Sequence, residues 1–296
     1  MNVKKATSTC ALFGLMVIPF FASGCIVVVS TGCDWDGCTW GRSPAVWTEE
    51  TVQIPIESAG LTALEVRTHN GEIEFTGKPA GTPASVDVRK KAGGKSMEDA
   101  KEALAAIELI SQRSTSGEQK LGWRWKGIKR SRWAADVAFT IQAPGNLRFD
   151  SETHNGAVTA NGVVGDTKVV TQNGKVVVDS RDGKLYAETH NGAIAATYSG
   201  PSVTLETHNG EIKADLRQSG RVRGDITTHN GSIELSVGAG TAADLVAETD
   251  NGRVSYDAPI TVSSAGKSRL EGKLGSGGDR LELTTHNGGI NIKAAG

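Results

Sequence analysis

All six histidines of the chain occupy one position of a short repeated motif, and imidazoles placed in this way could bind a transition metal. The motif is the tetrapeptide Thr-x-Asn-Gly, which occurs eight times, and histidine fills its second position in six copies. These histidines are His69, His154, His190, His208, His229 and His286. Neighbouring imidazoles about 5 Å apart could share a metal ion, which makes His190, His208 and His229 candidate ligands. Alternatively they are exposed corner residues that stack on one another, and we expect this arrangement, with no metal and no cofactor.

Glutamates recur directly before the motif threonine, and carboxylates paired across a groove could cleave an acidic polysaccharide. They are Glu152, Glu188, Glu206 and Glu248. A catalytic pair would interrupt the repeat, whereas these residues follow it, which indicates one solvated stripe. The sequence also has no Gly-x-Ser-x-Gly elbow, no phosphate-binding loop and no histidine outside the repeat for a catalytic triad. We therefore expect a protein that is not an enzyme, with a polysaccharide-active β-helix enzyme as the alternative.

A third group of candidate residues combines cations with indoles. The segment from Lys120 to Arg132 holds six basic residues and no acidic one. Its candidate binding residues are Trp123, Arg124, Trp125, Lys126, Lys129 and Arg130. One interpretation is a β-hairpin that packs its tryptophans on a helix or on the first coil and leaves its charges in solvent. The other is a patch for an anionic partner such as lipid headgroups, an envelope polymer, a glycan or a protein, because clustered cations attract anions.

The spacing of the motif predicts the elements that position these side chains. Its copies start at Thr68, Thr153, Thr171, Thr189, Thr207, Thr228, Thr249 and Thr285. Successive starts are 85, 18, 18, 18, 21, 21 and 36 residues apart, and a period near 20 residues is typical of stacked supersecondary units. The interval of 36 equals two periods of 18, which predicts a coil that has lost its motif. The interval of 85 contains an insertion.

Each motif is flanked by apolar residues at alternate positions, which is the period of a half-buried strand. Two residues after every glycine stands isoleucine or valine, at Ile73, Val158, Val176, Ile194, Ile212, Ile233, Val254 and Ile290. Each unit is therefore expected to form a strand, an Asn-Gly corner, a second strand and a loop. Asparagine and glycine both tolerate the positive φ that a sharp turn requires.

Two folds could place such units side by side, an antiparallel meander of hairpins or a parallel β-solenoid. Asn-Gly is a strong hairpin signal, but hairpins gain nothing from identical residues at every turn. Identical corners that stack at ~4.8 Å would let the asparagines form a ladder of amide hydrogen bonds. We therefore predict an all-β, β-helix-like solenoid with three-sided coils of about 18–21 residues. One edge would carry His154, His190, His208 and His229, with Gln172 between the first two and Asp250 after the last.

The insertion lies between Arg89 and Pro144. Ser96 and Asp99 approximate a capping box, and the apolar residues that follow at helical spacing are Ala100, Ala103, Leu104, Ile107 and Ile110. This pattern predicts one amphipathic helix over residues 97–112, followed by the tryptophan-rich hairpin, near the N-terminal end of the solenoid.

The first residues have the composition of a secretory signal, with two lysines, an apolar run from Ala11 to Phe21 and small residues before Cys25. A cysteine after Ala-Ser-Gly resembles a bacterial lipobox, which implies removal of residues 1–24 and a lipid on Cys25. The alternatives are simple secretion and an uncleaved membrane anchor, since the apolar stretch reaches about 20 residues. All three place the chain outside the cytoplasm. We expect an extracytoplasmic protein anchored to the bacterial envelope, at the outer membrane or the cell surface.

Two further cysteines and the overall charge bear on compartment and partners. Cys33 and Cys38 could close a small disulfide loop in an oxidising compartment. The 296 residues include 37 glycines, and 32 basic residues nearly balance 33 acidic ones. This balance produces no global field that would draw the chain to nucleic acid. We therefore expect a membrane partner through the lipid anchor, no nucleic acid, and only local charge-driven binding.

The lipoprotein-like leader, the helix-bearing N-terminal β portion, Pro144-Gly145 and the serial Thr-x-Asn-Gly repeats together resemble a bacterial family of candidate adhesins. That family is built from β-strand repeats and is itself a family of unknown function. The resemblance covers about residues 53–296 and implies a β-helix-like extracytoplasmic domain with an adhesion or envelope role, without any catalytic residue. The chain as a whole would be a noncatalytic, envelope-tethered lipoprotein that acts in binding or scaffolding at the cell surface or in the periplasm. Its expected parts are a signal peptide (1–24), a tether (25–52), an N-terminal β portion (53–143) and a repeat solenoid (144–296).

Overall fold

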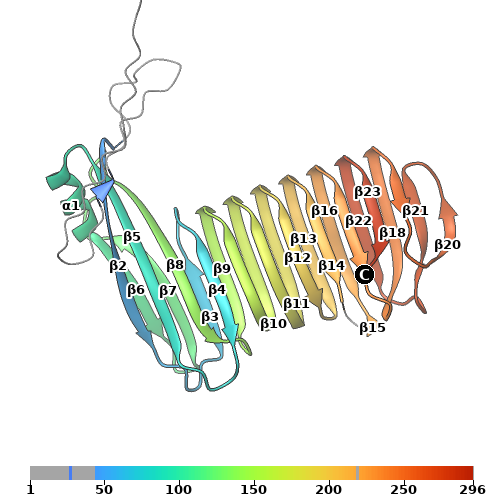
Figure 1. Ribbon diagram of the computed structural model, residues 1–296, viewed down its shortest axis with the longest axis horizontal. Helices are drawn as coiled ribbons and strands as arrows, with labels where there is room; N and C mark the ends of the chain where they lie inside the picture. Colours follow the sequence, from blue (N-terminus) through green and yellow to red (C-terminus); the bar gives the residue numbers. More distant parts are fainter. Residues whose placement is uncertain (1–26, 29–43, 218–219, 296) are drawn as a thin grey trace, which may run out of the picture.

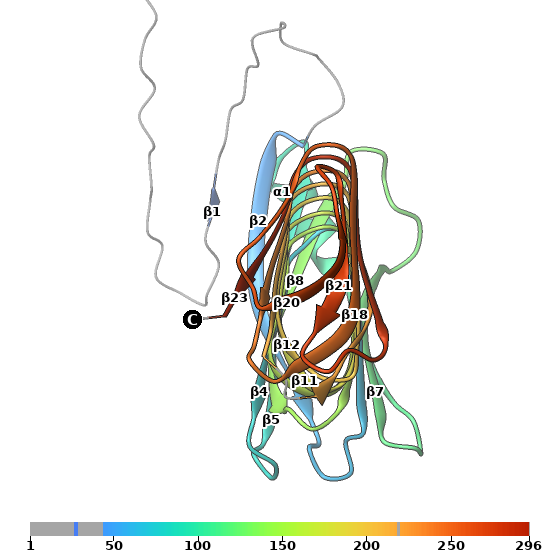
Figure 2. The same ribbon diagram turned by 90° about the vertical axis from the view of Figure 1, so that its right-hand side faces the viewer.

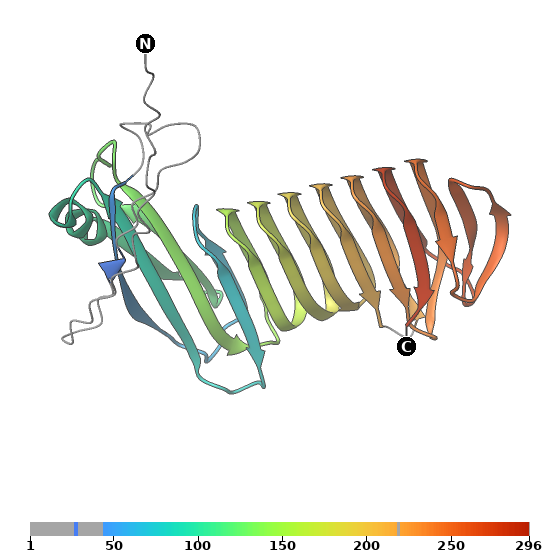
Figure 3. The same ribbon diagram turned by 45° about the horizontal axis from the view of Figure 1, so that its top comes forward.

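The chain forms a stack of thin layers of β-strands, with one helix at the N-terminal end of the stack (Figures 1 and 3). The computed structural model describes residues 27–28, 44–217 and 220–295. The predicted signal segment 1–24, the predicted lipid-attachment site Cys25 and the predicted disulfide pair Cys33 and Cys38 lie outside the described residues. Within those residues, no helix combines the length and the apolar character needed to cross a bilayer.

Each layer contributes one strand to each of two faces, and the motif forms the corner between them. Strands that lead into the corner are β3 (Ala63–Arg67), β9 (Arg148–Asn155), β13 (Ser202–Asn209), β16 (Arg223–Asn230), β18 (Thr241–Asn251) and β22 (Arg280–Asn287). Strands that leave it are β4 (Ile73–Lys78), β12 (Ile194–Ser199), β14 (Ile212–Leu216), β17 (Ile233–Val237), β19 (Val254–Tyr256) and β23 (Ile290–Ala294). The long strands β10 (Val158–Asn173) and β11 (Val176–Asn191) run through both faces, and the short β15 (Gly220–Arg221) pairs with β18.

Parallel pairing between layers confirms the predicted solenoid and its coil length. Val158 lies beside Val176, which is 18 residues later, and Ile212 lies beside Ile233, which is 21 residues later. Viewed along the stack, the coil is flattened, with two long faces (Figure 2). Outside the motif, β10 has two register shifts, one between Asn161 and Val163 and one between Gly165 and Thr167, and the short segment 163–165 between them connects the two long faces.

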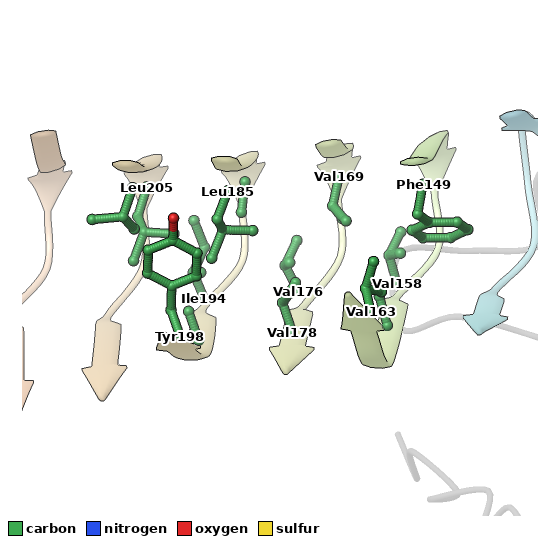
Figure 4. Close-up of a cluster of buried hydrophobic side chains, with 14 of the residues drawn as sticks. Phe149, Val158, Val163, Val169, Val176, Val178, Leu185, Ile194, Tyr198 and Leu205 are labelled. Atoms are coloured by element: carbon green, nitrogen blue, oxygen red, sulfur yellow. The ribbon is translucent and has the colours of Figure 1, made fainter. Parts of the chain in front are cut away.

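The interior is filled by the alternating apolar residues of both faces (Figure 4). The isoleucine or valine two positions after each motif glycine is buried in all eight layers, from Ile73 at 0% exposure to Val254 at 9%. The position two residues further on is also buried, except at Tyr256, which is 44% exposed. Removing this continuous apolar row from water is the main favourable term for stacking.

The order of layers differs from the order of the chain at the C-terminal end. The last motif strands, β22 and β23, insert between β16 and β17 on one side and β18 and β19 on the other. Figure 1 shows this as dark-red strands between orange ones. The interval of 36 residues therefore does not contain a coil without its motif, and that prediction was wrong. It contains β20 (Ile260–Ala265) and β21 (Arg269–Leu274), which pair antiparallel and cover the edge of β18.

A similar exchange occurs at the N-terminal end. The first motif layer consists of β3 and β4, and it contacts β9 and β10 on one side. On its other side lies a layer without the motif, formed by β7 (Glu118–Trp125) and β8 (Ala134–Pro144), which come later in the chain. Antiparallel strands close this end: β6 (Ile107–Arg113), β5 (Ala84–Gly94), β2 (Val46–Ile56) and β1 (Val27–Val28).

The inserted helix is shorter than predicted. Helix α1 covers Met97–Ala105, and Ser96 caps it as expected by accepting a hydrogen bond from the Asp99 amide at 3.3 Å. Residues 107–112, which were predicted to be helical, belong to β6. Ile107 lies opposite Trp125 on β7, and this cross-strand pairing outweighs the helical spacing of Ile107 and Ile110.

Candidate functional site

The eight motif asparagines form one continuous ladder along the corner edge, as predicted. Each side-chain amide nitrogen donates to the Oδ1 of the asparagine in the preceding layer, at 2.7–3.0 Å. At the start of the ladder, Asn70 donates to the carbonyl of Ala135 at 3.2 Å. Because the stack order is exchanged near the end, Asn287 joins Asn230 and Asn251 joins Asn287.

The motif threonine points inward and bonds to the neighbouring layer. The Thr207 hydroxyl donates to the carbonyl of Gly192 at 2.9 Å, and the side chain is 6% exposed. The equivalent threonines of the other layers make the same kind of bond. Threonine therefore satisfies a corner carbonyl that would otherwise lack a partner inside the stack.

In most layers the motif glycine is required for close approach between layers and not for a left-handed backbone, since only Gly71 and Gly288 of the eight have a positive φ. A Cβ on Gly192 would lie 2.0 Å from the carbonyl oxygen of Gly174, and Gly210 and Gly231 show the same contact at 1.9 Å. None of these three glycines has a positive φ. The explanation by positive φ was therefore wrong for them, because the limiting factor is the carbonyl of the adjacent layer.

The second motif position forms an outward column in which the imidazoles stack. Ring centroids are 4.7 Å apart for His190 and His208, 4.8 Å for His208 and His229, and 4.7 Å for His229 and His286. The column contains six histidines and not the four expected, because the exchanged layer brings in His286 and the first layer brings in His69, which contacts His154 at 4.8 Å. Gln172 interrupts it as predicted, and Asp250 follows His286 and hydrogen-bonds to its Nδ1.

The stacked geometry bears on the candidate metal ligands His190, His208 and His229. Their ring planes lie 1° and 3° from parallel. Nitrogen lone pairs lie in the ring plane, so those of parallel rings point the same way and do not converge on one ion. Across the residues that the structure describes, no group of three or more His, Cys, Asp or Glu side chains has the arrangement of a metal site.

The glutamates before the motif threonine fall into two kinds. Glu152 pairs with Arg67, and Glu248 pairs with Arg269. Glu188 and Glu206 occupy adjacent layers, and neither has an ion-pair partner within the described ranges. The two unpaired carboxylates are thus neighbours at the centre of the stripe.

The environment of these two carboxylates is acidic. Burial, together with the carboxylates of Glu188 and Asp225, raises the pKa of Glu206. The Tyr186 hydroxyl donates to Glu188 at 2.6 Å, and burial together with this bond raises the pKa of Tyr186. Tyr186 and Asp225 were missed from the sequence. Both lie three residues before a motif threonine, so the outward alternation of the strand could have identified them.

Glu188, Glu206 and the four stacked histidines from His190 onward line one shallow groove along the face that leads into the corner. The other lining residues are Thr189, Thr207, Thr227, Thr228, Asp250, Thr284 and Thr285, and the volume is about 600 Å³. The groove follows the layers, so imidazoles and threonine hydroxyls recur along it. The position before the motif threonine holds a carboxylate at Glu188 and Glu206 and a hydroxyl at Thr227 and Thr284. This is an arrangement that can bind an extended ligand by several weak contacts.

The tryptophans of the basic segment pack on both elements that the hairpin interpretation named. Trp123 donates to the Thr68 hydroxyl of the first motif at 3.0 Å, and the buried Trp133 donates to Asp99 of α1 at 2.9 Å. Trp125 lies between them, with its ring centroid 5.5 Å from Trp123 and 5.6 Å from Trp133. The indoles therefore form a wall between the helix and the first layers.

The candidate cations of this segment differ in their partners. Arg124 pairs with Glu108 at 2.7 Å, and Arg130 pairs with Glu102 and contacts Asp99 at 3.4 Å. Lys126 and Lys129 lie in the exposed connection between β7 and β8. That connection also holds Ile128, which is 94% exposed and was not singled out from the sequence.

Comparison with solved structures finds similar chains at low identity. A candidate adhesin from Bacteroides fragilis is 14% identical, with a TM-score of 0.42, over 86% of this chain and 100% of that one. A candidate adhesin from Parabacteroides merdae is 10% identical, with a TM-score of 0.39, over 84% and 96%. A candidate lipid-binding protein from Parabacteroides distasonis is 12% identical, with a TM-score of 0.36, over 84% and 97%. No curated protein matches the chain.

The family comparison covers most of the chain. A family model described as Toastrack DUF4097 matches residues 44–293. This range begins just before β2 and ends within β23, so it contains the complete column of motif corners. The chain therefore belongs to the Toastrack DUF4097 family.

Proposed function

We propose that this protein is a noncatalytic binding or scaffolding domain of the adhesin type. It would act at the cell surface or in the periplasm, held at the envelope by a lipid on Cys25. The solved structures to which the chain is similar include candidate adhesins and a candidate lipid-binding protein.

The observation that carries the proposal is the repeated groove on the face that leads into the corner. The imidazoles repeat in successive layers with ring centroids 4.7–4.8 Å apart, and Glu188 and Glu206 add carboxylates in two adjacent layers. A catalytic site concentrates strain and unusual groups at one point, whereas here the outward groups follow the repeat. A ligand that is itself linear and repetitive, such as an envelope glycan, would match this surface through many equivalent contacts.

The binding role is tested by probing arrays of envelope glycans and lipids with the purified protein. A groove variant, Glu188→Gln with Glu206→Gln and His208→Gln, is compared with a control on the opposite face, Thr197→Ala with Lys213→Ala. We expect the groove variant to lose at least tenfold in affinity for any ligand that the parent binds, while the control retains it. Equal affinities of parent and groove variant would place binding elsewhere.

The tether is tested separately by mass spectrometry of the envelope fraction. We expect a mature chain that begins at a lipid-modified Cys25, with Cys33 and Cys38 two hydrogens lighter than the free thiols. The variant Cys25→Ser should leave the envelope or keep residues 1–24. A mature chain with an unmodified Cys25 would contradict the lipid anchor.

The alternative of a polysaccharide-active enzyme is supported by one feature, the raised pKa of Glu206 beside Glu188. Glycoside cleavage requires a carboxylic acid that can donate a proton beside a second carboxyl group. Release of reducing ends from acidic polysaccharides, abolished in Glu206→Gln, would establish this activity. Absence of release from a panel of such polymers supports the noncatalytic role.

A further inference from the structure

We propose that the connection between β7 and β8 is a contact surface for an anionic lipid bilayer. Residues 126–132 of this connection are called here the cationic tip. In the motif layers the equivalent position holds the tight Thr-x-Asn-Gly corner, whereas here seven residues project beyond the stack. In Figure 2 the green chain that joins β7 to β8 projects from the side of the molecule.

The cationic tip presents an apolar side chain to solvent at its centre. Ile128 is 94% exposed, while the other large hydrophobic side chains exposed in the described part of the chain, Tyr256 and Val262, are 44% and 38% exposed. Transfer of such an exposed aliphatic side chain from water to the boundary between headgroups and acyl chains is favourable in free energy.

Cations surround Ile128. Lys126, Lys129 and Arg132 are exposed, and none of them has an ion-pair partner among the described residues. Arg130 differs from them, because it forms ion pairs with Glu102 and Asp99 of α1. The three remaining charges are therefore free to face an anionic surface, to which basic residues are attracted within a Debye length.

The cationic tip has a firm base, which limits the conformational entropy that binding would cost. The Lys126 amide donates to the Ala106 carbonyl at 2.7 Å, and the Trp133 amide donates to the Arg130 carbonyl at 3.0 Å. Lys129 lies over the ring of Trp125 at 6.0 Å. The indoles of Trp123, Trp125 and Trp133 thus lie next to the cationic tip, and tryptophan is typical of membrane interfaces.

The cationic tip lies at the end of the molecule where the chain from the N-terminus enters the fold. Helix α1, to which Arg130 is bonded, packs on Gly94 so closely that a Cβ there would lie 2.5 Å from the Ala100 nitrogen. Gly94 accepts a hydrogen bond from the Ala45 amide at 3.0 Å. A lipid on Cys25 would bring the bilayer to this end, so this step of the argument rests on the proposed tether.

A bilayer fits these groups better than a soluble polyanion, because a polymer of acidic sugars would use the cations and leave Ile128 in water. The test is hydrogen exchange of the full chain, measured by mass spectrometry on peptides that cover residues 126–132. Three additions are compared: phosphatidylglycerol vesicles, phosphatidylcholine vesicles and soluble dextran sulfate. We expect at least threefold slower exchange with phosphatidylglycerol only.

Two variants should abolish this protection, Ile128→Ser and the triple change Lys126→Ser, Lys129→Ser and Arg132→Ser. A matched control changes three exposed lysines of the solenoid, Lys168, Lys175 and Lys184, to serine and should keep it. Unchanged exchange of the parent with phosphatidylglycerol, or equal protection by dextran sulfate, would overturn the proposal. A chain that still floats with vesicles while its tip stays unprotected retains the tether, so the two proposals fail separately.

Discussion

His190 and His208 stack face to face, with ring centroids 4.7 Å apart and planes 1° from parallel. This separation equals the spacing of neighbouring strands in a sheet, so the distance between the rings is set by the distance between adjacent layers. His229 and His286 continue the stack at 4.8 and 4.7 Å. Four imidazoles therefore face one another directly.

Acid is expected to weaken this part of the stack. Protonated imidazoles at this separation repel, so we expect a lower melting temperature at pH 5 than at pH 7.5. The variant with His190, His208 and His229 changed to glutamine, the residue already present at Gln172, should lose less stability on acidification than the parent. Scanning calorimetry of both proteins at both pH values measures this. An identical loss in parent and variant would show that the imidazoles do not contribute.

The asparagine ladder predicts that an internal rung matters more than a terminal one. Asn191→Ala removes two side-chain hydrogen bonds, to Asn173 and from Asn209, whereas Asn251→Ala removes one, to Asn287. At about 1 kcal/mol for each bond, we expect costs of about 2 and about 1 kcal/mol in the free energy of unfolding. Chemical denaturation gives both values. Equal costs would mean that the rungs act independently of their position.

The motif glycine should not tolerate even one methyl group. Gly192→Ala places a Cβ 2.0 Å from the backbone oxygen of Gly174, which cannot move without separating two layers. We expect a loss of about 3 kcal/mol or more, or failure to fold. Gly266→Ala is the matched control, since its Cβ would meet its nearest atom at 3.8 Å, and we expect a change within about 0.5 kcal/mol. Comparable losses in the two variants would refute the close-approach explanation.

Glu206 is expected to destabilise the fold at neutral pH. Its pKa is raised in the folded chain, so its ionised form is less favoured there than in the unfolded chain. The penalty is present above the folded pKa and disappears as the pH falls below the ordinary value of 4.5. Glu206→Gln should therefore raise the melting temperature at pH 7.5 and have little effect at pH 3.5.

Glu152→Gln serves as the control for that experiment. Glu152 occupies the same column but pairs with Arg67, so its substitution should bring no gain at pH 7.5. A gain of the same size in both variants would mean that charge number, and not the local environment of Glu206, sets the effect.

Local patterns in the sequence were sufficient for the architecture of one layer. The alternation around each motif determined that Ile194 and Ile212 point inward and that His190 and His208 point outward, because successive side chains of a strand take opposite faces. The repeat of identical corners determined the parallel stack and the asparagine ladder. The cap at Ser96 followed from its own neighbours along the chain.

Only the tertiary structure decided which layers are neighbours and what surrounds the exposed groups. All eight corners carry the same motif, so nothing in the sequence distinguishes Asn287 from Asn251 as the partner of Asn230. Contacts between distant segments make that choice, as they end the helix at Ala105 and pair Arg130 with Glu102. Periodicity determines the face that a side chain takes, because it is a property of the local backbone. The identity of its partner depends on the free energy of the whole assembled stack.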